Sequence, residues 1–247
     1  MELSNRKTIL SHSDLQFVLG GPPKTSTFWL AECLRSHPDI FITSETNFLS
    51  HHTHKTYEFW KNYFSRLKNE SIVGEYANGY FAHSTVPEKL AQANPHIKII
   101  FSIRDPIAQV ISFYQHDLQY GTLGRHVKLR FAINRDIFYT RYIDSICYSK
   151  HLRTWLKYFP ANQIYLFSNS PDPTLRQKRL NDLYLFLRGS SHSPNCIDKR
   201  LNTRQNPLFP TWFRNSRMSQ NVLVRLLALM INPINLGLGK LFVSSSI

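Results

Sequence analysis

Residues 17–34 read FVLGGPPKTSTFWLAECL, and this stretch decides the fold. An apolar strand runs into the turn Gly20–Pro23, which is followed by Lys24 and by the hydroxyl residues Thr25–Thr27. Apolar residues at helical spacing then predict a helix through Trp29–Leu34. The backbone N–H groups at the start of a helix have no partner within the helix, and the helix dipole favours an anion there. The stretch therefore predicts a phosphate-binding loop between a strand and a helix.

Short apolar runs and helical patterns alternate along the rest of the chain. Further strands are expected at Ile40–Ile42, Ser71–Gly74, His96–Ile103 and Gln163–Phe167. Helices are expected at Thr56–Leu67, Pro87–Ala93, Pro106 to about Tyr120, Tyr142–Phe159 and Leu175–Leu187. This alternation predicts an α/β fold in three layers, with a central, mostly parallel sheet, helices on both faces and the P-loop-like loop after the first strand. Ligands of such sheets bind at the carboxyl ends of the strands.

The length of 247 residues predicts one domain, with a core at residues 13–210 and a C-terminal helical tail at residues 211–247. The chain has 30 Lys+Arg against 16 Asp+Glu, so its formal net charge is +14. This excess indicates an anionic partner without choosing among nucleotides, sulfated substrates, nucleic acid and membrane surfaces.

The cysteines and the apolar runs bear on the cellular compartment. Cys33, Cys147 and Cys196 are odd in number and far apart, so the sequence shows neither a disulfide framework nor a zinc spacing. There is no signal-peptide pattern and no apolar run of about 18 residues or more. We expect a cytoplasmic chain without an integral membrane segment.

Two common phosphate-binding motifs are missing from the loop. The ATP- and GTP-binding motif needs G-x-x-x-x-G-K-[ST], and the loop lacks its Gly-Lys pair. The dinucleotide motif G-x-G-x-x-G is also absent. Ordinary ATP, GTP or dinucleotide chemistry is therefore poorly supported.

Residues 21–30, GPPKTSTFWL, resemble the phosphosulfate-binding loop of sulfotransferases that use 3′-phosphoadenosine 5′-phosphosulfate (PAPS), whose pattern is roughly G-x-P-K-[ST]-G-T-T-x-L. The resemblance implies that the co-substrate is bound by Pro23, Lys24, Thr25, Ser26, Thr27 and Phe28. Two of these positions depart from the pattern. Ser26 replaces a glycine and reduces backbone freedom, and Phe28 replaces a threonine and removes a hydroxyl.

A second segment, KIIFSIRDPIAQVISFYQH at Lys98–His116, resembles the 3′-phosphate segment of the same family. Arg104 and Ser112 occupy its two phosphate-binding positions. An arginine at a strand end can bind a phosphate with two parallel hydrogen bonds, and a serine hydroxyl can add a third. The combination implies a nucleotide with a 3′-phosphate, which PAPS has and ATP lacks.

Residues 196–207, CIDKRLNTRQNP, resemble the basic loop with which these enzymes close over the nucleotide. Lys199, Arg200 and Arg204 are its cations, and Arg204 aligns best. The overall likeness covers about Leu15 to Pro207 and is closer to the heparan sulfate type and to bacterial sulfotransferases than to the cytosolic steroid and phenol type.

Sulfuryl transfer needs a base for the acceptor and a positive charge at the leaving oxygen. The resemblance gives the second role to Lys24. Ser44-Glu45-Thr46-Asn47-Phe48 matches the segment that carries the glutamate base of heparan-type enzymes, so Glu45 is the predicted base. His116 is the reserve candidate.

The acceptor has no readable code in the sequence. Residues 75–81, EYANGYF, resemble the family's E-K-x-x-x-Y-F, with Tyr76 in place of a lysine that assists catalysis on glycans. This favours a small-molecule alcohol or amine and leaves a glycan acceptor open. His51, His52 and His54 do not make a convincing metal site, and no metal is expected.

Two different functions compete with sulfuryl transfer. One is a nucleotide or small-molecule kinase with a degenerate loop, which would use ATP and magnesium. The second is a non-catalytic binder of nucleic acid or of an anionic glycan, which would explain the net charge of +14 without chemistry. The pair Arg104 and Ser112 argues against the kinase, and Glu45 argues against the binder. We expect no nucleic-acid partner.

Overall fold

The structure, a computed structural model, describes residues 11–124, 126–132 and 141–198. These residues form two compact units. The first unit comprises residues 11–103 with 154–198, and the second comprises the described residues from 104 to 153. The predicted tail at residues 211–247 lies outside the described residues, and the assignment of residues 1–247 to one domain stays a prediction.

The first unit is built on a five-stranded sheet in the order β2-β3-β1-β4-β5. All its strand pairs are parallel. The strands are β1 (Phe17–Leu19), β2 (Ile40–Glu45), β3 (Ile72–Tyr76), β4 (Lys98–Ile103) and β5 (Ile164–Ser168). β1 is central and buried along its whole length, as expected for a strand that is covered on both faces.

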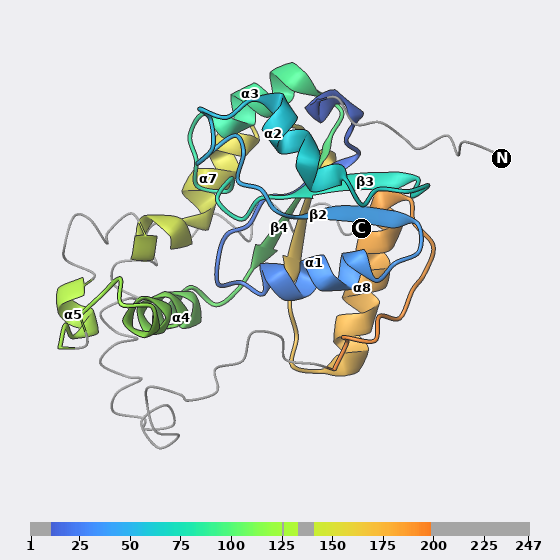
Figure 1. The fold of residues 1–247 in the computed structure, drawn as a ribbon. Helices are drawn as coiled ribbons and strands as arrows, with labels where there is room; N and C mark the ends of the chain where they lie inside the picture. The colour runs from blue at the N-terminus through green and yellow to red at the C-terminus, as the bar shows by residue number, and fades with distance from the viewer. Residues whose placement is uncertain (1–10, 125, 133–140, 199–247) are drawn as a thin grey trace. The chain divides into compact units, whose positions relative to one another are not determined.

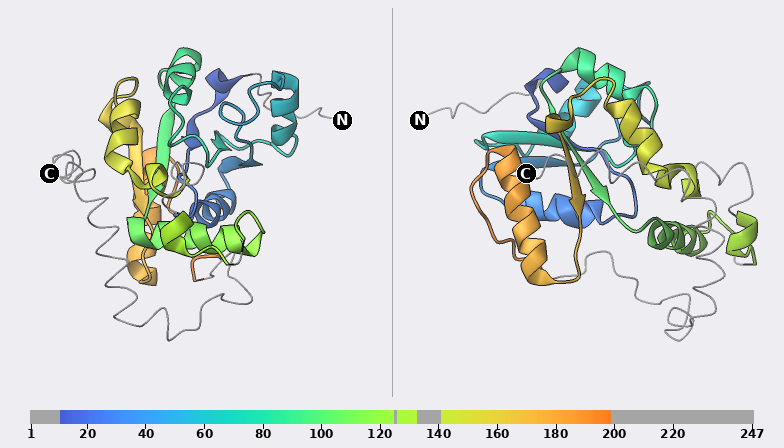
Figure 2. Two further views of the ribbon diagram at one scale, coloured as in Figure 1. Left: turned by 90° about the vertical axis from the view of Figure 1, so that its left-hand side faces the viewer. Right: turned by 180° about the vertical axis from the view of Figure 1, so that it is seen from behind.

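Helices cover both faces of this sheet (Figure 1). α1 (Thr27–Arg35) and α8 (Pro173–Leu187) lie on one face, and α2 (Tyr57–Lys61) and α3 (Val86–Ala93) lie on the other. The two further views in Figure 2 show the same layering. The predicted α/β class, with a parallel sheet between helices, is confirmed.

The face under α1 and α8 holds a continuous apolar core. Leu30 and Leu34 of α1 meet Leu183 and Leu187 of α8 over sheet residues such as Phe17. These helix residues recur at three- and four-residue spacing, which places them on one side of each helix. The burial of this stripe holds the phosphate-loop helix rigidly against the strands.

The opposite face contains a buried carboxylate. Glu75 of β3 is fully buried and accepts hydrogen bonds from Trp60 Nε1 (2.9 Å), the Tyr80 hydroxyl (3.1 Å) and the Thr46 hydroxyl, and it contacts His12 Nε2 at 2.9 Å. A buried charge is tolerated only where partners of this kind replace water. Glu75 therefore ties α2 and the segments at residues 12, 46 and 80 to the sheet.

The second unit contains α4 (Pro106–Gln119), α5 (Leu129–Ala132), the 3-10 turn Asp144–Ile146 and most of α7 (Tyr148–Trp155). Asp105 caps α4: its carboxylate accepts from Ala108 N at 2.7 Å, and Pro106 is the first helical residue, as predicted. Buried Asp117 binds Arg141 Nη2 (2.7 Å) and the Tyr142 hydroxyl (2.6 Å). This ion pair ties α4 to the segment that precedes α7.

Several predicted boundaries are wrong. β2 continues to residue 45 instead of ending at 42, and β3 continues to residue 76 instead of ending at 74. The two strands keep pairing beyond an irregularity between Ile42 and Glu45. The helix expected at Thr56–Leu67 is a short α-helix followed by a 3-10 turn at Asn62–Phe64. The helix expected at Tyr142–Phe159 is divided into the turn at Asp144–Ile146 and α7. The connection at residues 121–135, which has no helical pattern in the sequence, includes α5.

Candidate active site

The loop between β1 and α1 is held by backbone contacts at the carboxyl ends of the central strands. Gly20 N donates to Ile100 O (2.9 Å), and Ser102 N donates to Gly21 O (2.8 Å). Gly21 has φ +105°, and a Cβ there would lie 2.1 Å from Asn78 O. Only glycine therefore fits this turn, because both the backbone angle and the space exclude a side chain.

The start of α1 is open toward the loop. Lys24 and Ser26 both have left-handed backbone angles, with φ of 67° and 73°. Ser26 occupies the N-cap position but makes no side-chain cap hydrogen bond. The N–H groups of the first helical turn therefore lack the usual capping oxygen, which suits an anion at this position. Lys24, four residues before Phe28, is half-exposed in the same loop.

Two of the three hydroxyl residues of the loop, Thr25 and Thr27, are buried. Thr25 is fully buried, and its hydroxyl donates to Pro22 O (2.6 Å) and contacts the Ser102 hydroxyl of β4. Thr27 is also buried, and its side chain lies close to the Tyr76 hydroxyl. The Thr25 hydroxyl is thus engaged within the protein, and binding of the nucleotide by Thr25 stays a prediction for which its backbone N–H remains.

Glu45 is the last residue of β2 and pairs with Tyr76, the last residue of β3. The sequence predicts it beyond the strand, and it instead lies within the strand, so the sheet fixes its backbone. The Glu45 carboxylate is exposed and accepts from Asn47 Nδ2 at 2.6 Å. Burial raises the pKa of Tyr76 to about 12, and the nearby Glu45 charge adds to the rise. The polar side chains of Thr27 and Asn78 act in the opposite direction and lower this pKa. Tyr76 therefore stays neutral at pH 7 and joins the loop helix to the predicted base.

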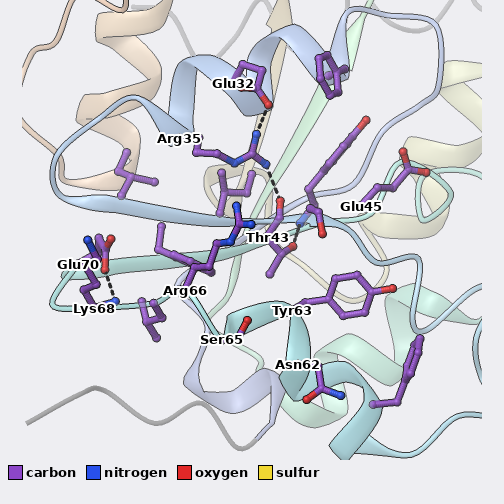
Figure 3. A pocket seen from close by; sticks show the side chains of 18 residues that line it. Glu32, Arg35, Thr43, Glu45, Asn62, Tyr63, Ser65, Arg66, Lys68 and Glu70 are labelled. Carbon is purple, nitrogen blue, oxygen red and sulfur yellow. Dashed lines mark hydrogen bonds and ion pairs between the residues drawn. The ribbon is translucent and has the colours of Figure 1, made fainter.

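A pocket of about 1140 Å³ opens beside Glu45. Figure 3 shows Glu45 and Tyr63 toward one end, Lys68 and Glu70 toward the other, and Arg66 between them. Arg35 donates to Thr43 O (2.8 Å) and forms an ion pair with Glu32. The charges of Arg35 and Glu32 therefore neutralise each other in the wall of the pocket. The aromatic lining consists of Phe28, Phe41, Phe59, Tyr63 and Tyr76. The pocket thus offers apolar rings near a carboxylate and a guanidinium group farther away.

Phe28 belongs to this pocket. Its side chain is 41% exposed, high for a large apolar group, and it lines the cavity from the first turn of α1. The place of this residue in the loop predicts that it binds the co-substrate. Its ring forms a wall of the pocket, and binding of the co-substrate by residue 28 stays a prediction.

Arg104, Ser112 and His116 belong to the second unit. Arg104 is exposed and directly follows the last residue of β4. Its backbone oxygen accepts a hydrogen bond from the Tyr148 hydroxyl at 3.1 Å. Ser112 and His116 lie on α4 and are half-buried, and His116 Nδ1 is 3.4 Å from Asp117 Oδ1. That Arg104 and Ser112 bind the same nucleotide as the loop, and that His116 is the reserve base, stay predictions.

Lys199, Arg200 and Arg204 lie outside the described residues, so their predicted contacts with the nucleotide stay predictions. Arg66 is a pocket residue to which the sequence does not point, since the walls of the acceptor site are expected from the aromatic helix at residues 57–64, the connection at residues 121–135 and the tail. An isolated arginine after a helix is an ordinary surface pattern, and only the fold brings it beside β2.

The sequence profile described as "Sulfotransferase domain" matches residues 14–169, well over half of the chain. The chain belongs to the sulfotransferase family. This match spans the loop, Glu45, Arg104 and Ser112. The resemblance found in the two sequence motifs is thereby confirmed.

Named relatives of this family member include glycan-modifying enzymes. Heparan sulfate glucosamine 3-O-sulfotransferase 3B1 of Mus musculus is 28% identical over 176 residues, covering 68% of this chain and 45% of that protein. Heparan sulfate glucosamine 3-O-sulfotransferase 5 of Homo sapiens is 28% identical over 181 residues, covering 66% and 52%. The chain therefore spans about half the length of these relatives.

Solved sulfotransferases share the fold. A sulfotransferase from Alicyclobacillus acidocaldarius superposes with a TM-score of 0.69 at 16% identity, covering 90% of this chain and 94% of that chain. Mouse sulfotransferase SULT7A1, solved in complex with PAP, gives a TM-score of 0.56 at 15% identity, covering 87% and 84%. Among the residues described in this sulfotransferase-family chain, no helix is long and apolar enough to cross a membrane, and no cluster of His, Cys, Asp and Glu could hold a metal ion.

Proposed function

We propose that this chain transfers a sulfuryl group from PAPS to a hydroxyl or amine of a small-molecule acceptor, releasing adenosine 3′,5′-bisphosphate (PAP). The observation that supports this most directly is the position of Glu45: it pairs with Tyr76 at the strand ends, both residues line the pocket, and the Tyr76 side chain lies close to Thr27 of α1. This arrangement supports a base and an acceptor beside the start of α1.

The proposed reaction is an in-line displacement without a covalent enzyme intermediate. The acceptor oxygen or nitrogen attacks the sulfur as Glu45 removes its proton, and the bond from sulfur to the bridging phosphate oxygen breaks. Lys24 stabilises the negative charge that develops on this oxygen, and the open N–H groups of α1 hold the 5′-phosphosulfate. Arg104 and Ser112 bind the 3′-phosphate, with Arg204 as a further contact. No metal takes part.

The pocket supports a small acceptor with an aromatic or apolar body. Rings of Phe28, Phe41 and Tyr63 provide surfaces for stacking in the pocket that Glu45 also lines. Tyr76 fills the position where the family's glycan-modifying enzymes have a lysine, which argues against a glycan. The rival proposal is a glycan acceptor, which the names of the heparan sulfate relatives favour. A cytoplasmic location also stays a proposal.

The test is transfer from PAPS, followed by mass detection of PAP and of sulfated product. Phenolic and aliphatic alcohols, amines and heparan-type oligosaccharides would be offered in parallel. We expect product with a small alcohol or amine and a loss of at least ~100-fold in turnover for Lys24→Ala. Lys89→Ala, an exposed lysine on α3, is the matched control and should be unchanged. A protein that neither transfers sulfate nor binds PAP would overturn the proposal, and exclusive sulfation of oligosaccharides would favour the rival.

A further inference from the structure

Cys33 and Cys196 meet in the first unit although they are 163 positions apart in the sequence. Cys33 lies on the inner side of α1, and Cys196 follows α8. Their Sγ atoms are 3.0 Å apart. The sequence gives no sign of this pair, because its three cysteines are widely spaced and odd in number. Only the packing of the segment after α8 against α1 brings the two thiols together.

Neighbouring side chains hold both cysteines in place. Trp29 Nε1 donates to Cys196 O at 3.0 Å, and Arg176 donates to the carbonyl oxygen of Ile197. The Arg176 guanidinium group also lies 5.7 Å from the centre of the Trp29 ring. Tyr184 of α8 donates to Cys33 O at 3.3 Å. The contact between the sulfur atoms is therefore part of a packed cluster and not a chance approach of a loose loop.

We propose that Cys33 and Cys196 are a site of reversible oxidation and form an intramolecular disulfide. A disulfide has a sulfur–sulfur distance of about 2.05 Å, so the two Sγ atoms need to approach by roughly 1 Å. Rotation of a cysteine side chain about its Cα–Cβ bond moves Sγ by more than this distance. This inference concerns the thiols alone and does not depend on the proposed transfer reaction.

The two thiols differ in access, which sets the order of events. Cys196 is partly exposed, whereas Cys33 is fully buried. The Cys196 thiolate attacks one sulfur of oxidised glutathione and releases one glutathione thiolate, which leaves a mixed disulfide. Cys33 then loses its proton to solvent and attacks Cys196 Sγ, which expels the second glutathione. Two protein thiols are oxidised, and one glutathione disulfide is reduced to two thiols.

Burial, together with the hydrogen bond to Cys196, raises the pKa of Cys33 well above its ordinary value. The thiolate is the attacking form, so the second step should be slow at neutral pH and faster at higher pH. The closed bond would join α1 to the segment after α8 across a long loop, which limits the freedom of the unfolded chain.

The test treats the full chain with oxidised glutathione and then counts free thiols. We expect the count to fall from three to one, and peptide mass spectrometry to find a Cys33–Cys196 crosslink within a single chain. The melting temperature should rise by on the order of 10 °C, and dithiothreitol should reverse the rise.

Cys147 provides the matched control, because it is buried in the second unit and its Sγ donates to Ile143 O, a bond that a serine can keep. Cys147→Ser should retain the crosslink and the melting shift, whereas Cys196→Ser should lose both. Since Cys196 is only partly buried, Cys196→Ser should fold. Cys33→Ser should also lose the crosslink and the melting shift. Three free thiols after treatment, a crosslink that contains Cys147, or a disulfide between two chains would each overturn the proposal.

Discussion

Glu45 and Tyr76 are paired residues at the ends of the neighbouring parallel strands β2 and β3. The family's glycan-modifying enzymes have a lysine at the position of Tyr76, so this chain places a neutral phenol beside its candidate base. Burial keeps the Tyr76 hydroxyl protonated by raising its pKa to about 12. The phenol also lies close to Thr27, so the residue that replaces a cation stands between β3 and the start of α1.

The first prediction concerns Glu45. Glu45→Gln should lower turnover about 100-fold or more, because the amide cannot accept the proton of the acceptor. The affinity for PAP should stay within about twofold, since binding of the nucleotide does not use this carboxylate. Steady-state kinetics and calorimetric titration with PAP measure the two effects separately.

Glu70→Gln is the control for this variant, because Glu70 lines the same pocket at the end away from Glu45. It should retain turnover. If Glu45→Gln stays active while His116→Ala is inactive, the base is His116 and the assignment of Glu45 is wrong.

The second prediction concerns Phe28. Phe28→Thr restores the residue usual in the family and removes the ring that lines the pocket. The KM for an aromatic acceptor should rise about 10-fold, because a stacked ring contributes about 0.5–1.5 kcal/mol beyond the area it buries. PAP affinity should not change, since the backbone N–H at residue 28 remains. Phe131→Thr removes a ring of similar exposure (51%) in the second unit and should leave the KM unchanged. A loss of PAP affinity in Phe28→Thr alone would place the ring at the nucleotide instead.

The fold and the loop could be predicted from local sequence because their signals are local. The apolar run of β1, the glycine turn and the cap at Asp105 each act within a few residues. The pocket and the thiol pair could not be predicted in this way. Arg66 reaches β2, and Cys196 reaches Cys33, only after segments distant in the sequence have packed. The same holds for Glu75, whose donors come from four separate segments.

The third prediction concerns Ser26, which stands where the family usually has glycine. Its φ of 73° lies in the left-handed region, which costs a residue with a Cβ roughly 1–2 kcal/mol. Ser26→Gly should therefore raise the free energy of unfolding by about 1 kcal/mol. Urea denaturation measures the change.

Ser65→Gly is the matched control, because Ser65 has an ordinary helical φ of −58°. This substitution should lower the free energy of unfolding by roughly 0.5–1 kcal/mol. Glycine has more conformational freedom than serine in the unfolded chain, and at this backbone angle it relieves no strain in the folded protein. Destabilisation by both substitutions would show that the serine side chain at residue 26 stabilises the loop despite its backbone angle.

The fourth prediction concerns Glu75 and the dependence of stability on pH. Burial alone would raise the pKa of Glu75, but the nearby His12 and the hydrogen bonds from His12, Thr46 and Trp60 outweigh it, so the pKa lies below its ordinary value of 4.5. The folded protein therefore binds the proton less readily than the unfolded chain. The resulting stabilisation is fully present above about pH 4.5 and is lost as the pH falls through the lowered pKa.

Glu75→Gln should lower the free energy of unfolding at pH 7 by roughly 3–5 kcal/mol, because it leaves the donors around residue 75 without their charged acceptor. The difference from the unmodified chain should shrink as the pH falls below 4.5, because residue 75 is protonated first in the unfolded chain and, at its lowered pKa, also in the folded protein. Urea denaturation across this pH range measures both effects. Glu58→Gln on α2 is the control; it alters an exposed pair with Lys61 and should change stability by less than about 1 kcal/mol at every pH.

Trp60→Phe keeps the prediction testable if Glu75→Gln does not fold. It removes one donor to the carboxylate and preserves most of the ring. The free energy of unfolding at pH 7 should fall by about 1.5–3 kcal/mol, as expected for a hydrogen bond to a charged group, and this loss should also shrink below pH 4.5. A loss that stays constant with pH would mean that Glu75 is already neutral at pH 7, because only a charged acceptor makes the hydrogen bond from Trp60 depend on the titration of residue 75.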